Sequence, residues 1–166
     1  MPASEAGYAC LPGRSERDLG LARFVADTDG HPATEEVLSG RGLANVYAFE
    51  AQPAPADTDA ADVMALAAEG DPTAQKAVGT FLDLLGVVSG DLALEHMPMG
   101  GIYFAGGVSR AMAPYFEGSN FEASFRTKGK LSDLMNSFSI SLIEDDYAPL
   151  LGTAAHLSRQ NAPSPH

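Results

Sequence analysis

One segment, residues 72–96, most constrains the fold, because it predicts a long helix that is apolar on several faces. Pro72 suits the first turn of a helix, where its missing N–H costs nothing. A helix that is apolar nearly all round is stable only when other elements cover it. We therefore expect this helix in the middle of a folded domain. Its apolar residues include Val78, Phe81, Leu82, Leu84, Leu85, Val87, Val88, Leu92 and Leu94.

The elements around this helix are mostly helical, with only two clear strands. Strands are predicted at 101–107 and 137–145, and the Pro/Asp/Ala-rich stretch 51–60 indicates a surface connection. Two strands make a poor sheet, yet the long apolar helix needs a sheet to cover. We therefore expect the second part of an α/β domain whose first strands lie elsewhere. Further helices are predicted at about 15–27, 35–49, 61–70, 109–116, 120–129 and 148–160.

Composition disfavours several classes of partner. The 166 residues suit one domain, or half of a two-lobed protein. Ten Lys and Arg residues stand against 22 Asp and Glu residues, and the resulting net charge of −12 disfavours nucleic acids and anionic membrane surfaces. The single cysteine, Cys10, forms neither an internal disulfide nor a Cys-rich zinc site. We expect no apolar run near the roughly 18 residues that span a bilayer and no signal peptide, hence a cytoplasmic protein.

A glycine pair, Gly106 and Gly107, follows the first predicted strand and precedes a helix that Ser109 is expected to cap. Ligands of α/β folds bind where strands end and helices begin. Glycines let a flat ring or a sugar approach the backbone, and a helix N-terminus attracts phosphate. The pattern therefore indicates a nucleotide site, although an ordinary tight turn explains it equally well.

A second glycine-bearing segment, "LSGRGLANVY" (38–47), lies within the helix predicted at 35–49. Glycines are poor residues for a helix interior. Their presence indicates either a close approach of another segment or a broken first turn.

Five motifs in order resemble the C-terminal half of bacterial ATP-dependent glucokinases, which belong to the actin-like sugar kinase and Hsp70 superfamily. The resemblance runs from about residue 5 to residue 157. It implies an incomplete large lobe of an actin-like, ribonuclease H-like kinase fold in residues 1–157, final helix included, and a disordered tail at 158–166. The motifs are "EAGY" (5–8), "EEVLSGRGLANVY" (35–47), "GGIYFAGGV" (100–108), "FEASFRTKGK" (121–130) and "LLGTAAHL" (150–157).

The resemblance implies ATP and Mg²⁺ as cofactors and assigns Gly106 and Gly107 to the adenosine motif. The earlier pair, Gly100 and Gly101, would only let the chain turn into the strand. A turn that includes Gly40 would lie near the nucleotide cleft. Ser39 would either hydrogen-bond there or cap a helix, and we favour the cap.

The sugar contacts implied by the resemblance are Glu5, Tyr8 and Glu35. Paired carboxylates accept hydrogen bonds from sugar hydroxyls, whereas without the motif both would be taken as solvated acidic residues. Family members carry His where this chain has Tyr8, whose phenol is longer and does not replace imidazole as an acceptor. The other histidines, His31, His96 and His156, lack metal-ligand spacing and are expected at the surface or at helix ends, and no metal ligand is assigned.

No catalytic residue is assigned, because in this family the catalytic Asp and the phosphate loops precede the matched region. We expect the isolated chain not to phosphorylate glucose at a normal rate. We also expect exposed apolar surface along residues 81–94, which would lead to a homodimer, to aggregation or to pairing with an N-terminal kinase lobe. The alternative is a non-catalytic module, or a subunit of a split kinase, that binds sugar or nucleotide.

Overall fold

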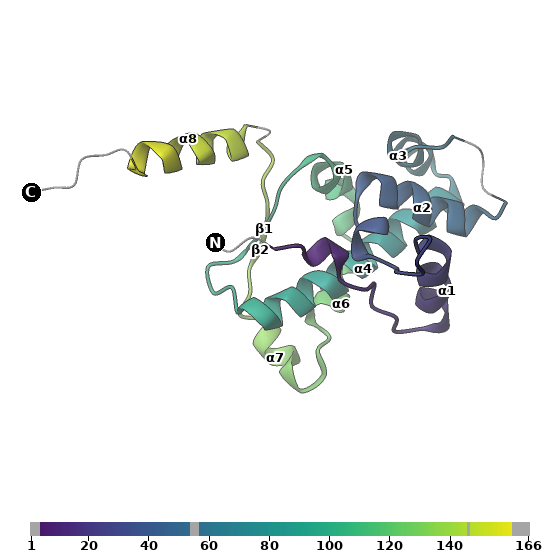
Figure 1. Cartoon of the computed structure of the whole chain (residues 1–166), viewed down its shortest axis with the longest axis horizontal. Helices are drawn as coiled ribbons and strands as arrows, with labels where there is room; N and C mark the ends of the chain where they lie inside the picture. Colours follow the sequence, from purple (N-terminus) through teal and green to yellow (C-terminus); the bar gives the residue numbers. More distant parts are fainter. Residues whose placement is uncertain (1–3, 54–56, 146, 161–166) are drawn as a thin grey trace, which may run out of the picture.

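The computed structural model describes residues 4–53, 57–145 and 147–160, and helix α4 (Pro72–His96) lies at its centre (Figure 1). The side chain of Asp71 caps its start by accepting from the N–H of Ala74 at 2.7 Å. Helices α2 (Gly40–Ala51), α3 (Ala60–Glu69) and α6 (Phe121–Arg126) pack against α4. The expected position of the long apolar helix in the core is confirmed.

Glycines on one side of α4 let α6 come close. A Cβ added to Gly86 would lie 2.3 Å from the carbonyl oxygen of Phe121, and one added to Gly90 would lie 2.6 Å from that of Phe125. Such distances are far below any ordinary contact, so no side chain fits at either position. The two helices therefore touch backbone to backbone.

Burial of α4 corrects two expectations. Phe81, Leu82, Leu84 and Val87 are buried, so the predicted exposed apolar surface along residues 81–94 is wrong. The helix also contains an 18-residue window with a mean hydropathy of 1.6, so an apolar segment of spanning length is present after all. Because 61% of that window is buried inside the fold, the segment is accounted for as a core helix.

The predicted helix 35–49 is divided into the 3₁₀ turn η2 (Thr34–Glu36) and helix α2. A Cβ on Gly42 would lie 2.3 Å from the carbonyl oxygen of Val37, so the chain folds back tightly over the first turn of α2. Both readings of the glycines, a close approach and a broken first turn, are thus correct.

The sheet consists of two parallel strands, β1 (Ile102–Phe104) and β2 (Ile140–Leu142), as the fold prediction expects. Ile102 pairs with Ile140 and Phe104 with Leu142. Tyr103 points to the opposite face and is 62% exposed. Parallel sheets are normally covered on both faces. Within the described residues, this one is covered by helices on one face only.

The remaining elements complete the order along the chain. Helix α5 begins at Gly107 with Gly106 as its N-cap, so the prediction that Ser109 caps it is wrong. The 3₁₀ turn η3 and the short helix α7 are not predicted from the sequence. The bounds are η1 (Ala6–Tyr8), α1 (Glu16–Val25), α5 (Gly107–Phe116), η3 (Gly129–Leu131), α7 (Ser132–Met135) and α8 (Ala148–Gln160).

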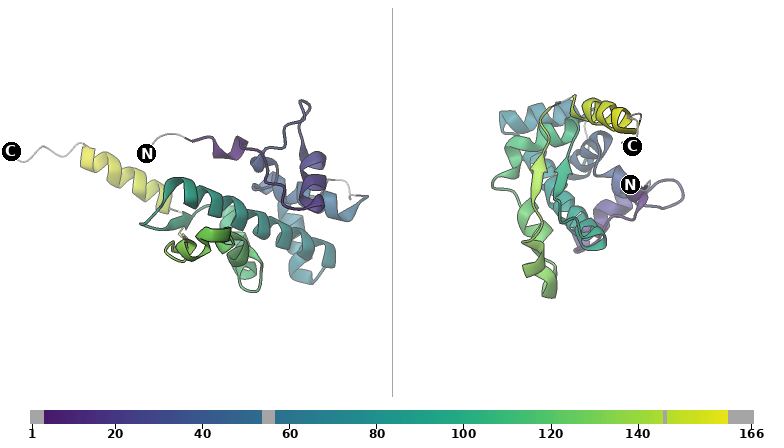
Figure 2. Two further views of the ribbon diagram at one scale, coloured as in Figure 1. Left: turned by 90° about the horizontal axis from the view of Figure 1, so that it is seen from below. Right: turned by 90° about the vertical axis from the view of Figure 1, so that its left-hand side faces the viewer.

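Helix α8 projects away from the rest of the fold (Figures 1 and 2). Its apolar residues Leu150 and Leu151 are 66% and 60% exposed. Among the described residues, α8 is thus one of the places where large apolar side chains are exposed. The helix extends to Gln160, and the part of the expected tail at 161–166 lies outside the described residues.

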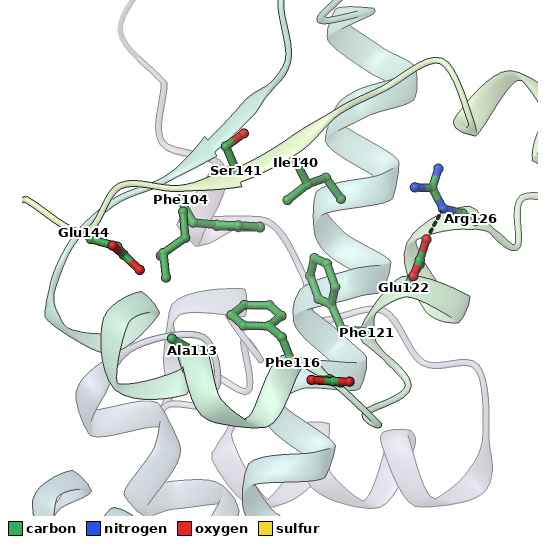
Figure 3. Close-up of a pocket in the computed structure, with 11 residues that line it drawn as sticks. Phe104, Ala113, Phe116, Phe121, Glu122, Arg126, Ile140, Ser141 and Glu144 are labelled. Carbon is green, nitrogen blue, oxygen red and sulfur yellow. Dashed lines mark hydrogen bonds and ion pairs between the residues drawn. The ribbon is translucent and has the colours of Figure 1, made fainter.

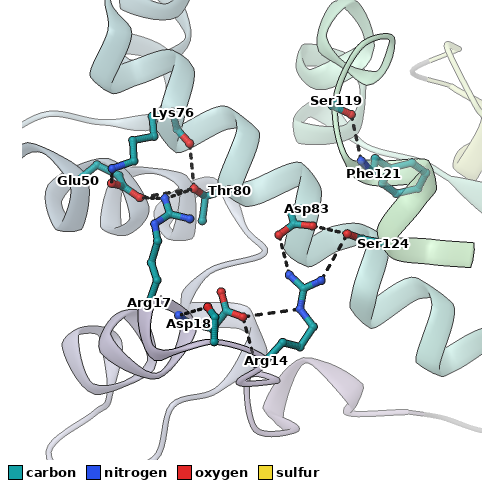
Figure 4. Close-up of polar contacts among 11 residues, drawn as sticks. Arg14, Arg17, Asp18, Glu50, Lys76, Thr80, Asp83, Ser119, Phe121 and Ser124 are labelled. Carbon is teal, nitrogen blue, oxygen red and sulfur yellow. Dashed lines mark hydrogen bonds and ion pairs between the residues drawn. The ribbon is translucent and has the colours of Figure 1, made fainter. Parts of the chain in front are cut away.

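Buried charge ties α1 and α2 to α4 (Figure 4). The carboxylate of Glu50 in α2, with its side chain only 3% exposed, pairs with Arg17 of α1 and with Lys76 of α4 at 2.8 Å. Arg17 also donates to the hydroxyl of Thr80 at 2.6 Å. This buried carboxylate of α2 thus contacts cationic side chains from both α1 and α4.

Candidate functional site

The structure brings the three predicted sugar contacts onto two adjoining 3₁₀ turns. Glu5 precedes η1 and accepts from the N–H of Tyr8 at 3.0 Å, while Glu35 lies in η2. The two turns are in contact, and a Cβ on Gly7 would lie 3.4 Å from Oε2 of Glu35, an ordinary van der Waals distance. All three side chains are exposed, Tyr8 at 64%, so they are open to a ligand.

Backbone pairing fixes this arrangement. Cys10 and Ala33 form an isolated antiparallel bridge. Thr34 donates twice to the carbonyl of Ala9, through its N–H at 2.8 Å and through its hydroxyl at 2.9 Å. The η1 and η2 turns are therefore held by hydrogen bonds between segments 20 or more residues apart.

Sequence reasoning misses one residue of this region, His31, which it places at the surface or at a helix end. Its Nε2 lies 2.8 Å from the carbonyl oxygen of Tyr8. The preceding Asp27 accepts from the N–H of His31, and this hydrogen bond is the main reason that the pKa of Asp27 is lowered. The turn letters "DTDGH" are the only local signal that this histidine is held in place.

Ser39 connects Glu35 of η2 with the start of α2. Its hydroxyl donates to the carbonyl of Glu35 at 2.8 Å and accepts from the N–H of Gly42 at 2.9 Å. Its single proton is thus used within the protein, which agrees with the cap that we favour from the sequence.

The two glycine segments assigned to the nucleotide also meet. Gly40 begins α2 and Gly106 caps α5, and a Cβ on Gly40 would lie 3.9 Å from Cγ2 of Val108. Gly106 has φ 106°, a conformation that favours glycine. No atom lies within 4 Å of a Cβ added to Gly106 or Gly107, so the backbone there is open to a flat group.

The first glycine pair serves the chain itself. Gly101 has φ 98°, and a Cβ added there would lie 2.7 Å from Oγ of Ser139, the residue before β2. For Gly101, the expectation that this pair lets the chain turn into the strand is confirmed.

A cavity of about 540 Å³ lies between the segment around Glu5 and the C-terminal part of α4. Glu5 lines it from one side, and Val88, Leu92 and His96 line it from the other. Glu35 is not among its lining residues, although the neighbouring Thr34 is. The two predicted sugar carboxylates therefore adjoin each other without lining one common pocket within this chain.

A second cavity, about 570 Å³, lies elsewhere, between β2, α5 and α6 (Figure 3). Phe116 and Phe121 meet edge to face at its floor with ring centroids 4.8 Å apart. None of the predicted site residues lines it.

The fit of the implied cofactors differs between ATP and Mg²⁺. The open glycines at the N-terminus of α5 suit an adenosine and its phosphates. Within residues 4–53, 57–145 and 147–160, no group of three or more His, Cys, Asp and Glu side chains is placed to hold a metal ion. We therefore assign no protein ligand and no step to Mg²⁺.

Comparison with known proteins identifies relatives along nearly the whole chain. Residues 1–160 match the family model described as Glucokinase. Glucokinase of Mesorhizobium japonicum is 36% identical over 156 residues, covering 92% of this chain and 46% of that protein. Glucokinase of Chromobacterium violaceum is 33% identical over 169 residues, covering 97% of this chain and 47% of that protein. The chain thus spans about half the length of the curated relatives it matches.

Solved structures agree. The crystal structure of glucokinase from an Antarctic psychrotroph matches with a TM-score of 0.85 and 30% identity, covering 95% of this chain and 50% of that one. Glucokinase from Balamuthia mandrillaris in complex with glucose matches with a TM-score of 0.72 and 20% identity, over 85% of this chain and 42% of that one. The second match shows the fold alone. The expected fold class, a helix-rich part of a glucokinase fold with two strands, is confirmed.

Proposed function

Since the chain belongs to the glucokinase family, we propose that it forms the sugar- and adenosine-binding part of a cytoplasmic enzyme that uses ATP to convert glucose to glucose 6-phosphate. The chain spans about half the length of its relatives, so the proposal concerns a half-site.

The observation that carries this proposal is the link between the two predicted binding regions. Glu35, a predicted sugar contact, and Gly40, a predicted nucleotide contact, lie five positions apart. The hydroxyl of Ser39 between them donates to the carbonyl of Glu35 and accepts from the N–H of Gly42. Phosphoryl transfer requires donor and acceptor to be held in line at close range. A short rigid connection between the two regions supports that geometry.

Each residue then has a role in binding. Glu5 and Glu35 accept hydrogen bonds from sugar hydroxyls, and Tyr8 donates one from its phenol. Gly106 and Gly107 leave room for adenosine, and the N–H groups at the start of α2, next to Gly40, and of α5 face the nucleotide phosphates. ATP supplies the phosphoryl group that is transferred.

The reaction also needs a base for the sugar hydroxyl, and we assign none to this chain. By the family resemblance, the catalytic Asp and the phosphate loops belong to the part of the relatives that this chain does not span. We propose that an N-terminal kinase lobe supplies them. The isolated chain is expected to form glucose 6-phosphate at least about 10²-fold more slowly than an intact relative, since loss of a base costs this much. Turnover within about tenfold of an intact relative would contradict this.

Calorimetric titration of the purified chain, with glucose and separately with ATP and Mg²⁺, tests the half-site. We expect heat with glucose and about a tenfold or larger loss of affinity in Glu35→Gln, because a hydrogen bond to a charged acceptor is replaced by a neutral one. Glu69→Gln, an exposed change at the end of α3, is the matched control and should bind as the parent does. No heat with either ligand would contradict the proposal.

The alternative function is a non-catalytic module that binds sugar or nucleotide. The observation that favours it is that the chain spans only about half the length of its relatives. Adding a polypeptide equivalent to the first half of a relative distinguishes the two functions. Restored turnover supports part of a kinase, whereas binding of glucose that never leads to turnover supports the module.

A further inference from the structure

His31 lies against the segment that carries two of the predicted sugar contacts. Its Nε2 is 2.8 Å from the carbonyl oxygen of Tyr8, the last residue of η1. A carbonyl only accepts, so this nitrogen carries the hydrogen. The other ring nitrogen, Nδ1, lies 3.8 Å from Sγ of Cys10 and is left to accept from the thiol. The imidazole thus connects two points of the segment that follows Glu5.

A hydrogen-bonded turn at residues 27–31 orients His31 toward this segment. One carboxylate oxygen of Asp27 accepts from the N–H of Asp29 at 2.9 Å and from that of His31 at 2.8 Å. The N–H of Asp27 in turn donates to the carbonyl of His31 at 3.2 Å. Gly30 takes φ 81°, which closes the turn. The backbone of His31 is therefore fixed independently of the pairing between residues 9–11 and 32–34.

The contact matters because η1 is short. A turn of three residues has little stability of its own, and its last carbonyl would otherwise depend on water. Tyr8 donates to the carbonyl of Glu5 at 3.0 Å, so fixing Tyr8 also fixes Glu5. We propose that His31 is a positioning residue that holds segment 5–8 in the conformation that binds sugar. This inference rests on the proposed function.

Three variants of the full chain test the inference. His31→Leu removes the donor at similar size, and His31→Gln restores a donor at the place of Nε2. His156→Leu changes an exposed histidine of α8 and is the control. Hydrogen exchange at the amides of residues 6–10 reports the segment itself, and calorimetry reports the affinity for glucose. The side-chain ¹⁵N spectrum of His31 reports its tautomer.

We expect His31→Leu to speed exchange at residues 6–10 by roughly three- to tenfold and to weaken glucose binding by a similar factor, as for the loss of one neutral hydrogen bond. His31→Gln should restore both, and the parent should show the Nε2–H tautomer. Unchanged exchange in His31→Leu overturns the positioning role, whatever happens to glucose affinity. If the parent binds no glucose, the proposed half-site fails while exchange still decides whether His31 holds the segment.

Discussion

Ser39 shows how one hydroxyl joins two regions of the site, since it caps α2 and also binds the carbonyl of Glu35. Ser39→Ala should lower the free energy of unfolding by about 1 kcal/mol, the usual loss for an N-cap. Ser39→Gly should lower the free energy of unfolding by only a few tenths of a kcal/mol. Urea unfolding measures both, with Ser158→Ala on the exposed helix α8 as a control that should be neutral. Equal stability of Ser39→Ala and the parent would show that the cap contributes nothing.

Asp27 gives the turn at 27–31 a pH dependence. Its pKa is lowered first by the hydrogen bond from the N–H of His31. A lowered pKa means that the carboxylate stabilises the turn above the ordinary pKa of an aspartate and loses this effect as the pH falls through its own pKa. The amide resonances of Asp29 and His31 should therefore move in acid with a midpoint below that of an ordinary aspartate. Asp27→Asn should abolish the transition, and a midpoint at or above the ordinary value would contradict the assignment.

For single residues, the sequence predicts interactions with neighbours along the chain and misses interactions with residues far away in the sequence. The cap at Ser39 follows from residue type and position, so it is predictable. The hydrogen bond of His31 joins it to Tyr8, 23 positions away, and no local pattern encodes that approach. The predicted cap at Ser109 is wrong because Gly106 caps α5 instead, so the helix starts three residues earlier than a cap at Ser109 would give.

Among the contacts between elements, the one between α4 and α6 depends on glycines, which have no side chain to keep the two backbones apart. Gly86→Ala would force a Cβ against the carbonyl of Phe121, and overpacking of this kind costs about 1–3 kcal/mol. Gly79, on the same helix, has no atom within 4 Å of an added Cβ. Gly79→Ala should therefore be neutral or stabilising by up to about 1 kcal/mol, because alanine favours helix. Denaturant unfolding of both variants measures the difference, and equal effects would contradict the close packing.

Most elements are predictable because periodicity and caps specify them locally, as Pro72 and the apolar faces do for α4. The prediction fails between residues 35 and 39, where tight folding over Gly42 interrupts a pattern that looks continuously helical. It also misses α7 (Ser132–Met135), which is too short for any periodicity to show. The sequence predicts that α4 lies in the core but not that α6 covers it, because no local pattern shows which element approaches Gly86 and Gly90.

For the whole molecule, the sheet and α8 are the least complete parts. The two-stranded sheet, with Tyr103 exposed on one face, and the exposed final helix α8 lie on the side away from α2 and α3 (Figure 1). The sequence predicts the shortage of strands correctly, because each strand is visible as a short apolar run. It wrongly expects exposed apolar surface on α4 and does not expect it on α8, because hydrophobicity alone does not say which helix the fold covers.

That exposed surface predicts how the purified chain behaves in solution. Leu150 and Leu151 on α8 are more than half exposed, and clustered exposed apolar side chains promote association. Light scattering over a range of concentrations should therefore show mass above that of a monomer. The double change Leu150→Gln with Leu151→Gln should restore the monomer. Leu131→Gln in η3, which also removes an exposed leucine, should leave the association unchanged. A parent chain that stays monomeric at every concentration would mean that α8 does not drive contact between copies.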